Sequence, residues 1–290
     1  DVDAKKIAQL ISKWLIHDHV IVCRIESFVH FIKIMSLYKR NISINDIENF
    51  SINYELSRLP RDDSILGVQS DGIDVDIDFD LTYFPTASPY IISANIKYEG
   101  LHITLLQLTW GQSLSWELID NVFKCNPNIK KVGFVGGVGY IGKENVNVDD
   151  IFIPEYLVES DDNYSIKKIR NNIFNSRDAV IFKGKKVAAG RLRTVTPKIG
   201  ILSSISKLPE HIKSKIDAVD MEMEAFIKKL DAYPDTKIGV CYYIMDKPNQ
   251  GQSLGSTYYN ISFLRNLFST YHRAKHYCFE RVLYFITIDE

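Results

Sequence analysis

The sequence predicts a single α/β domain with a central mixed sheet flanked by helices. Three observations support this fold class: β-branched apolar runs alternate with helical periods, glycine-rich turns separate them, and no internal repeat interrupts the pattern. The 290 residues suffice for a self-sufficient core, and the hydrophobic and charged fractions of 46% and 24% are ordinary for globular proteins. Wholesale disorder is therefore excluded.

Charge balance and cysteine usage exclude several classes of function. The chain has 35 Lys and Arg residues against 36 Asp and Glu, so it offers no global attraction to nucleic acid or anionic membranes. Four scattered cysteines without a C-x-x-C pair indicate reduced thiols rather than a disulfide frame or a zinc site. No apolar run reaches the roughly 18 residues of a membrane helix and no signal peptide opens the chain, so we expect a cytoplasmic protein.

Residues 1–72 are expected to form an N-terminal helical segment ahead of the main α/β domain of residues 73–290. Apolar residues at positions 4–16 recur at helical spacing. The run at 20–25 fits either a buried strand or the start of the following helix, and we favour the strand. Residues 41–72 are polar and rich in turn signals, which indicates an insertion.

The main domain is read from its periodicity. Alternating or β-branched apolar residues between turn signals predict strands at 73–81, 90–98, 102–108, 131–135, 151–155, 186–195 and 237–244. Apolar residues at helical spacing predict helices at 112–123, 220–230 and 258–284.

Two groups of residues resemble metal ligands, and for both we favour a solvated surface. The strand at 73–81 carries four aspartates on one face, but same-face side chains lie about 7 Å apart and do not converge on a calcium ion. His272 and His276 lie four residues apart without a third ligand. We therefore expect no metal and no cofactor.

A glycine cluster at 133–143 fits two nucleotide-binding patterns by letter, G-x-G-x-x-G and G-x-x-x-x-G-K. Both patterns need a helix that starts at the last glycine and binds phosphate with its amides, but the next residues alternate like a strand. Glu144 also stands where a phosphate-binding loop needs Ser or Thr. We expect Gly136 and Gly137 instead to let a ligand's ring lie against bare backbone.

Two further segments place carboxylates at the ends of regular elements. Val-Asp-Met-Glu-Met-Glu-Ala-Phe, at 219–226, puts three acids near a helix start, where complementarity to the helix dipole is sufficient explanation by itself. Asp246 follows the buried strand at 237–244, and the carboxyl end of a sheet strand is where α/β proteins bind ligands. A turn role ahead of Pro248 is the alternative for Asp246.

Taken in order, these segments resemble the nucleoside phosphorylase family, closest to its methylthioadenosine/S-adenosylhomocysteine nucleosidase branch. The resemblance rests on Gly-Phe-Val-Gly-Gly-Val-Gly, Asp-Asp-Ile-Phe-Ile-Pro, Val-Asp-Met-Glu-Met-Glu-Ala-Phe and Tyr-Tyr-Ile-Met-Asp-Lys-Pro, and covers roughly residues 90–284. Val-Asp-Met-Glu is its most specific piece. The resemblance implies a nucleoside phosphorylase-like fold with an N-terminal extension or insertion, and a homodimer.

The resemblance also implies residue roles. In the family, the residue matching Glu222 hydrogen-bonds the ribose hydroxyls, that matching Met221 packs against the sugar, and that matching Asp246 protonates or hydrogen-bonds purine N7. A carboxyl donor neutralises the departing base, and an anion near the hydroxyls stabilises the positive charge on the sugar. Thr109 and Val135, beside the two glycine turns, are expected to line the same pocket.

Phosphorylases of the family bind phosphate with arginines, one of them just before the first glycine turn. Here that turn reads Leu-Thr-Trp-Gly, without a cation, so hydrolysis fits better. The base that activates water follows the family's first strand, where Glu26 is the nearest candidate. We predict hydrolytic cleavage of the N-glycosidic bond of a purine nucleoside or adenine thioether nucleoside. The alternative is a non-catalytic or repurposed domain that binds a small ligand or partner.

Overall fold

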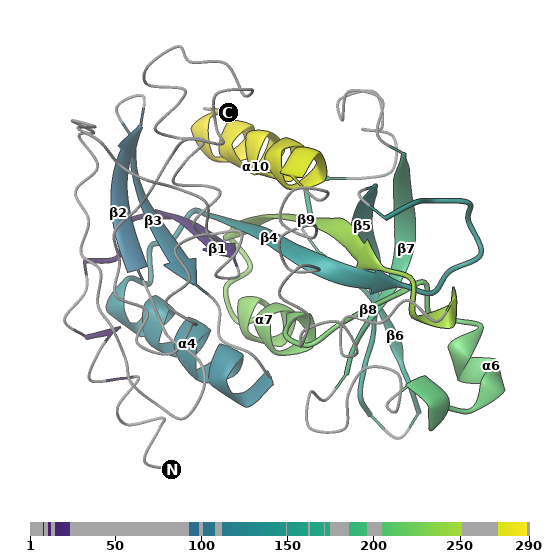
Figure 1. Ribbon diagram of the computed structural model, residues 1–290. Coiled ribbons are helices and arrows are strands. Elements are labelled where there is room, and N and C mark those ends of the chain that lie inside the picture. Colours follow the sequence, from purple (N-terminus) through teal and green to yellow (C-terminus); the bar gives the residue numbers. More distant parts are fainter. Residues whose placement is uncertain are drawn as a thin grey trace, which may run out of the picture.

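The computed structural model (Figure 1) describes residues 8, 11–12, 15–23, 93–98, 101–107, 112–148, 150–161, 163–170, 172–174, 186–195, 205–250 and 272–288. The predicted base Glu26, the predicted pocket residue Thr109, the insertion at 41–72 and the strand at 73–81 lie outside these residues.

The described strands form one nine-stranded mixed sheet. They are β1 (His19–Cys23), β2 (Ser93–Tyr98), β3 (Leu101–Gln107), β4 (Lys131–Tyr140), β5 (Ile151–Val158), β6 (Ile166–Lys168), β7 (Val187–Thr194), β8 (Ala218–Asp220) and β9 (Lys237–Asp246). Their order is β2-β3-β1-β4-β8-β7-β5-β6, and β9 pairs with both β4 and β5. The mixed sheet expected from the sequence is confirmed, as is the strand favoured near residues 20–25.

Strand β4 is the centre of this topology. It pairs in parallel with β1 and β9, and its last residues pair antiparallel with β8. Because β9 also pairs with β5, β5 with β7, and β7 with β8, the pairings close a ring through β4, β9, β5, β7 and β8. Through these pairings the last residues of β4, β7, β8 and β9 lie near one another, although β7 and β8 run opposite to β4 and β9.

The helices are α4 (Gln112–Cys125), α6 (Glu210–Lys213), α7 (Met223–Leu230) and α10 (His272–Thr287). Helices α4 and α7 cover one face of the sheet, while α10 crosses the other face (Figure 1). Beneath α7, the ring of Phe134 lies 5.6 Å from that of Phe226 and 5.2 Å from that of Tyr242. Since both faces of the sheet are covered, β4 and β9 are buried along nearly their whole length, which explains their continuous apolar runs.

Three predicted boundaries differ from the structure. Strand β4 continues through Tyr140, five residues beyond the predicted end at 135. The next described residues form turns instead of the expected strand, because the amide of Val146 bonds the Glu144 carbonyl and the amide of Asn147 bonds the Asp150 carboxylate. The first helical residue of α7 is Met223 rather than residue 220.

The C-terminal helix is described from residue 272, and residues 258–271 of the predicted helix lie outside the described part. None of the described helices is long and apolar enough to cross a membrane.

Candidate active site

Gly139 stands where three strands meet. In the sheet it is paired with Val219 of β8 and with Asp246, the last residue of β9, directly after a register irregularity at Val138. A Cβ atom at Gly139 would lie only 2.7 Å from Oδ1 of Asp246 and 3.3 Å from Cγ2 of Val219. The missing side chain therefore leaves the space that the buried Asp246 carboxyl occupies.

The acidic segment after Val219 spans a strand end, a bend and a helix start. Asp220 closes β8, where it pairs with Thr194 of β7, and its carbonyl accepts a bond from the amide of Val195. Glu222 is the N-cap of α7, and Glu224 lies in the first turn. All three carboxylates are buried, so a solvated helix start does not describe them.

Asp220 joins three elements through its carboxyl group. It accepts hydrogen bonds from the Thr194 hydroxyl at 2.6 Å, from the Tyr242 hydroxyl at 2.7 Å and from the Met223 amide at 2.9 Å. These bonds tie the end of β7 and the middle of β9 to the start of α7. Burial, and then the charge of Glu222, raise the pKa of Asp220 to about 7.

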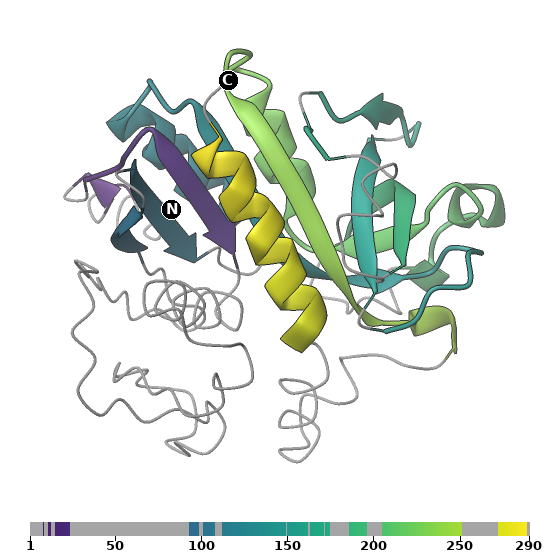
Figure 2. The same ribbon diagram turned by 90° about the horizontal axis from the view of Figure 1, so that it is seen from above.

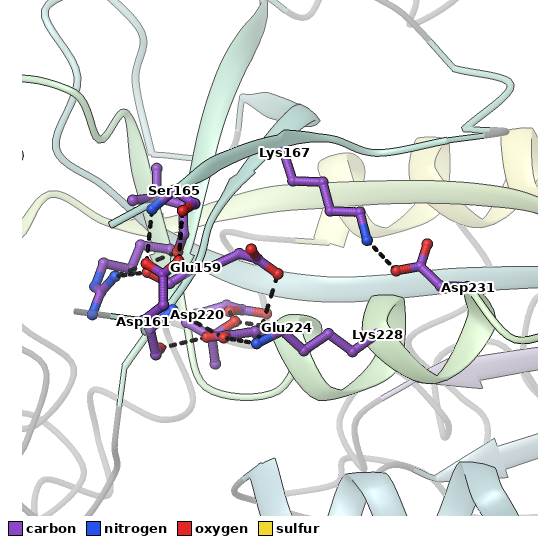
Figure 3. Close-up of polar contacts among 12 residues, drawn as sticks. Glu159, Asp161, Ser165, Lys167, Asp220, Glu224, Lys228 and Asp231 are labelled. Carbon is purple, nitrogen blue, oxygen red and sulfur yellow. Dashed lines mark hydrogen bonds and ion pairs between the residues drawn. The ribbon is translucent and has the colours of Figure 1, made fainter. Parts of the chain in front are cut away.

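Glu224 instead holds the loop after β5 (Figure 3). Its carboxylate accepts bonds from the Lys228 ammonium at 2.7 Å and from the Ser160 amide at 2.9 Å, with a further bond from the Ser160 hydroxyl. Burial alone would raise the pKa of Glu224, but the bonds from Lys228 and Ser160 outweigh it and lower that pKa. The Glu224 carboxylate therefore has a structural role, because Lys228 and Ser160 already bind it.

Arg193 fixes the same loop from β7. Its guanidinium donates a bond to the carbonyl of Glu159 at 2.7 Å and lies 4.9 Å from the centre of the Tyr164 ring. The side chain is buried, and burial lowers its pKa. Its charge is thus engaged by the protein's own backbone and by an aromatic ring.

The structure brings some of the predicted site residues together. Asp246 lies beside Gly139, and Met221 and Glu222 follow Val219 on the other side of that glycine. Met221 is partly exposed and packs against an apolar cluster that includes Val219. Glu222 is buried and makes no capping hydrogen bond with its side chain.

The predicted pocket residues of β4 have protein neighbours. Val135 is fully buried within the sheet. A Cβ at Gly136 would meet the ring of Phe134 at 2.8 Å, and one at Gly137 would lie 1.7 Å from Sδ of Met245. The Cβ side of both glycines is thus filled by side chains, and contact of Gly136 or Gly137 with a ligand stays a prediction.

The sequence did not indicate that Thr194 and Tyr242 would bind the Asp220 carboxyl group. Thr194 is the last residue of β7, and its hydroxyl both donates to Asp220 and accepts from the Glu224 amide at 2.8 Å. The rule that singled out Asp246, a polar residue at the carboxyl end of a strand, could have found Thr194. Tyr242 lies inside an apolar run and carries no comparable signal.

Replacing Asp220 with Asn should lower stability and weaken its dependence on pH. The Asn amide nitrogen cannot accept the Met223 N–H, which should cost about 1–3 kcal/mol at pH 5. The wild-type carboxyl titrates at about pH 7 when folded, against an ordinary value of 3.8. Between these pH values the unfolded chain binds fewer protons than the folded protein. The contribution of Asp220 to the free energy of unfolding therefore falls as pH rises, by up to about 1.4 kcal/mol per pH unit.

Urea denaturation of wild type and Asp220→Asn at pH 5, 6, 7 and 8 measures this effect. The difference in unfolding free energy between wild type and Asp220→Asn should shrink toward pH 8. A gap that stays constant over this range would show that Asp220 does not titrate there.

Comparison with solved structures finds the same architecture in enzymes that act on nucleosides. The apo 5'-methylthioadenosine nucleosidase of Arabidopsis thaliana matches with a TM-score of 0.60 at 11% identity, over 95% of this chain and 98% of that one. Uridine phosphorylase of Vibrio fischeri matches with 0.57 at 12%, over 93% and 92%. Futalosine hydrolase of Helicobacter pylori matches with 0.54 at 12%, over 90% and 97%.

Neither a family model nor a curated protein matches the sequence. The likeness is therefore one of structure, and it confirms the family resemblance at the level of the fold. The chain has the α/β fold of the superfamily that contains nucleoside phosphorylases and methylthioadenosine/S-adenosylhomocysteine nucleosidases.

Proposed function

We propose that this protein hydrolyses the N-glycosidic bond of a purine nucleoside or an adenine thioether nucleoside. The observation that carries the proposal is the pairing of Gly139 with both Asp246 and Val219. That pairing supports one site in which Asp246 faces the base while Met221 and Glu222 contact the sugar. Asp246 ends β9, and Met221 and Glu222 directly follow β8, so all three groups stand at strand ends that meet at Gly139.

Asp246 is the proposed acid. Cleavage of the bond leaves negative charge on the departing base, and a carboxyl group that donates to purine N7 neutralises it. The buried position of Asp246 at the end of β9 supports this role, because the surrounding strands hold the carboxyl in place.

Glu222 is the proposed partner of the ribose hydroxyls. The repeat Met-Glu-Met-Glu offers two Met-Glu pairs for this role, 221–222 and 223–224. The first pair is favoured because Met223 is fully buried and Glu224 is bonded to Lys228 and Ser160. A carboxylate next to the sugar stabilises the positive charge that develops there as the bond breaks.

Water rather than phosphate is the proposed nucleophile. Residues 108–111 include no Lys or Arg, and Arg193 is engaged by the Glu159 carbonyl and the Tyr164 ring. Phosphorolysis needs cationic side chains that bind the phosphate anion. Glu26 stays the predicted base for water.

The second candidate, a binding domain without catalysis, is favoured by one contact. The Met245 side chain fills the space beside Gly137, where we expected the ring of a ligand to lie. A nucleoside that needs this space would require Met245 to move. Under this alternative the protein binds a ligand, releases no base, and uses the carboxylates only to position it.

Release of free base from a panel of nucleosides tests the proposal. Adenosine, inosine, guanosine, uridine, methylthioadenosine and S-adenosylhomocysteine are incubated with wild type, Glu222→Gln and Glu224→Gln, without phosphate. We expect wild type to release a purine, Glu222→Gln to lose at least about 10²-fold in rate, and Glu224→Gln to keep its rate per folded molecule.

Equal losses in the two Gln variants would contradict the assignment of Glu222. No release by wild type, with a nucleoside still raising the melting temperature, would favour the binding domain over the nucleosidase.

A further inference from the structure

Two glycines bring helix α10 unusually close to the sheet. A Cβ at Gly133 of β4 would lie 2.3 Å from Cγ1 of Val282, and one at Gly239 of β9 would lie 2.7 Å from the Phe285 ring. The helix therefore rests directly on these two strands, and it runs alongside β9 in Figure 2. Cys278 lies one turn before Val282 on the same apolar stripe.

This close approach places two thiols in contact. The Sγ atoms of Cys241, in β9, and Cys278, in α10, lie 3.1 Å apart, and both residues are fully buried. A disulfide has a sulfur–sulfur distance of about 2.05 Å, so a movement of about 1 Å converts the contact into a bond. Both cysteines are reduced in this structure.

Neither of the other two cysteines is placed to pair with Cys241. Register places Cys23 of β1 opposite Val135 and Val135 opposite Cys241, so Cys23 lies two strands away from Cys241. Two strand spacings amount to about 9.6 Å, beyond the roughly 7 Å that a disulfide spans between Cα atoms. Cys125 ends α4, which covers the opposite face of the sheet from α10 (Figure 1), and its Sγ bonds the Ile11 carbonyl.

We propose that Cys241 and Cys278 form a reversible disulfide that ties α10 to β9. With a diazene such as diamide as oxidant, one thiolate adds to a nitrogen of the N=N bond, and the second thiolate attacks that sulfur. The S–S bond forms as the S–N bond breaks. Both thiol protons and the two electrons pass to the diazene, which leaves as a hydrazine.

The bond would close a loop that contains Asp246. The two cysteines are 37 residues apart in the chain, and closing a loop of that length restricts the unfolded state. The oxidised protein should therefore melt about 5 °C or more above the reduced protein. A reductant should reverse the shift.

The test oxidises folded wild-type protein with diamide, removes the oxidant, and alkylates the remaining thiols in denaturant before mass spectrometry. We expect two alkylated cysteines instead of four, a cross-linked peptide pair containing Cys241 and Cys278, and a higher melting temperature that dithiothreitol reverses. Cys278→Ser should lose the shift, and Cys125→Ser, the matched control, should keep it.

Four alkylated cysteines after overnight oxidation would overturn the proposal, as would a cross-link through Cys23 or Cys125. The peptide map of wild type decides the matter even if Cys278→Ser does not fold.

Discussion

Asp246→Asn should release base about 10²–10⁴-fold more slowly than wild type, because the amide keeps the shape of the side chain but cannot act as an acid. The residue is buried at the end of β9, so an isosteric change leaves its packing in place. Single-turnover release of base measures the effect, and nucleoside affinity should change only a few-fold.

Asp217→Asn is the matched control for this variant. Asp217 bonds Arg191 through a partly exposed carboxylate, and its backbone carbonyl accepts the amides of Ile141 and Gly142, which the substitution leaves in place. Its loss should affect stability and leave the rate per folded molecule unchanged. If Asp246→Asn kept the wild-type rate, another residue would have to supply the acid.

Gly139→Ala should reduce base release by about 10²-fold or more, although residue 139 has no side chain and carries no reacting group. The new Cβ would lie 2.7 Å from Oδ1 of Asp246 and 3.2 Å from Cγ of Pro248, so the carboxyl must move. A displacement of about 1 Å in a catalytic group is enough for a loss of this size. The rate should be measured at a temperature where circular dichroism shows the variant folded.

Gly239→Ala separates displacement of Asp246 from general overpacking. Its Cβ would lie equally close, 2.7 Å, to the Phe285 ring, but at the start of β9 rather than at its end. We expect a stability loss of about 1–3 kcal/mol and an unchanged rate per folded molecule. A slow Gly239→Ala together with an active Gly139→Ala would refute the role given to Gly139.

The strands were predictable where local composition decides them. β-branched apolar runs predicted the strands observed at His19–Cys23 and Lys237–Asp246, because strands covered on both faces need apolar residues throughout. Asp246 could be singled out because it follows such a run. Its position therefore needed no knowledge of tertiary structure, whereas its role as the acid is implied by the family resemblance.

The structure of the acidic segment at 219–226 was harder to predict, because it depends on residues that are distant in the chain. Val-Asp-Met-Glu fits a helix start by composition, but pairing with β7 draws Asp220 into a strand, and Thr194 and Tyr242 bind its carboxyl. Those partners are 26 and 22 residues away in the chain. A local sequence pattern cannot predict which residues of two strands pair over such distances.

The same limit applies to packing against glycine. Gly137 and Met245 fit together only because β4 and β9 are paired, and Cys241 meets Cys278 only because α10 crosses β9. Spacing along the chain predicted neither contact. Glu26 and Thr109, assigned from the family resemblance, stay predictions because they lie outside the described residues.

Identifying the sugar product in saturating phosphate tests the central claim most directly. Base and sugar are separated after wild-type turnover of the best nucleoside of the panel, and the sugar is analysed by mass spectrometry and phosphorus NMR. Hydrolysis predicts one free sugar for each base released, at a rate that phosphate does not change. Accumulation of sugar 1-phosphate, or release that requires phosphate, would contradict it.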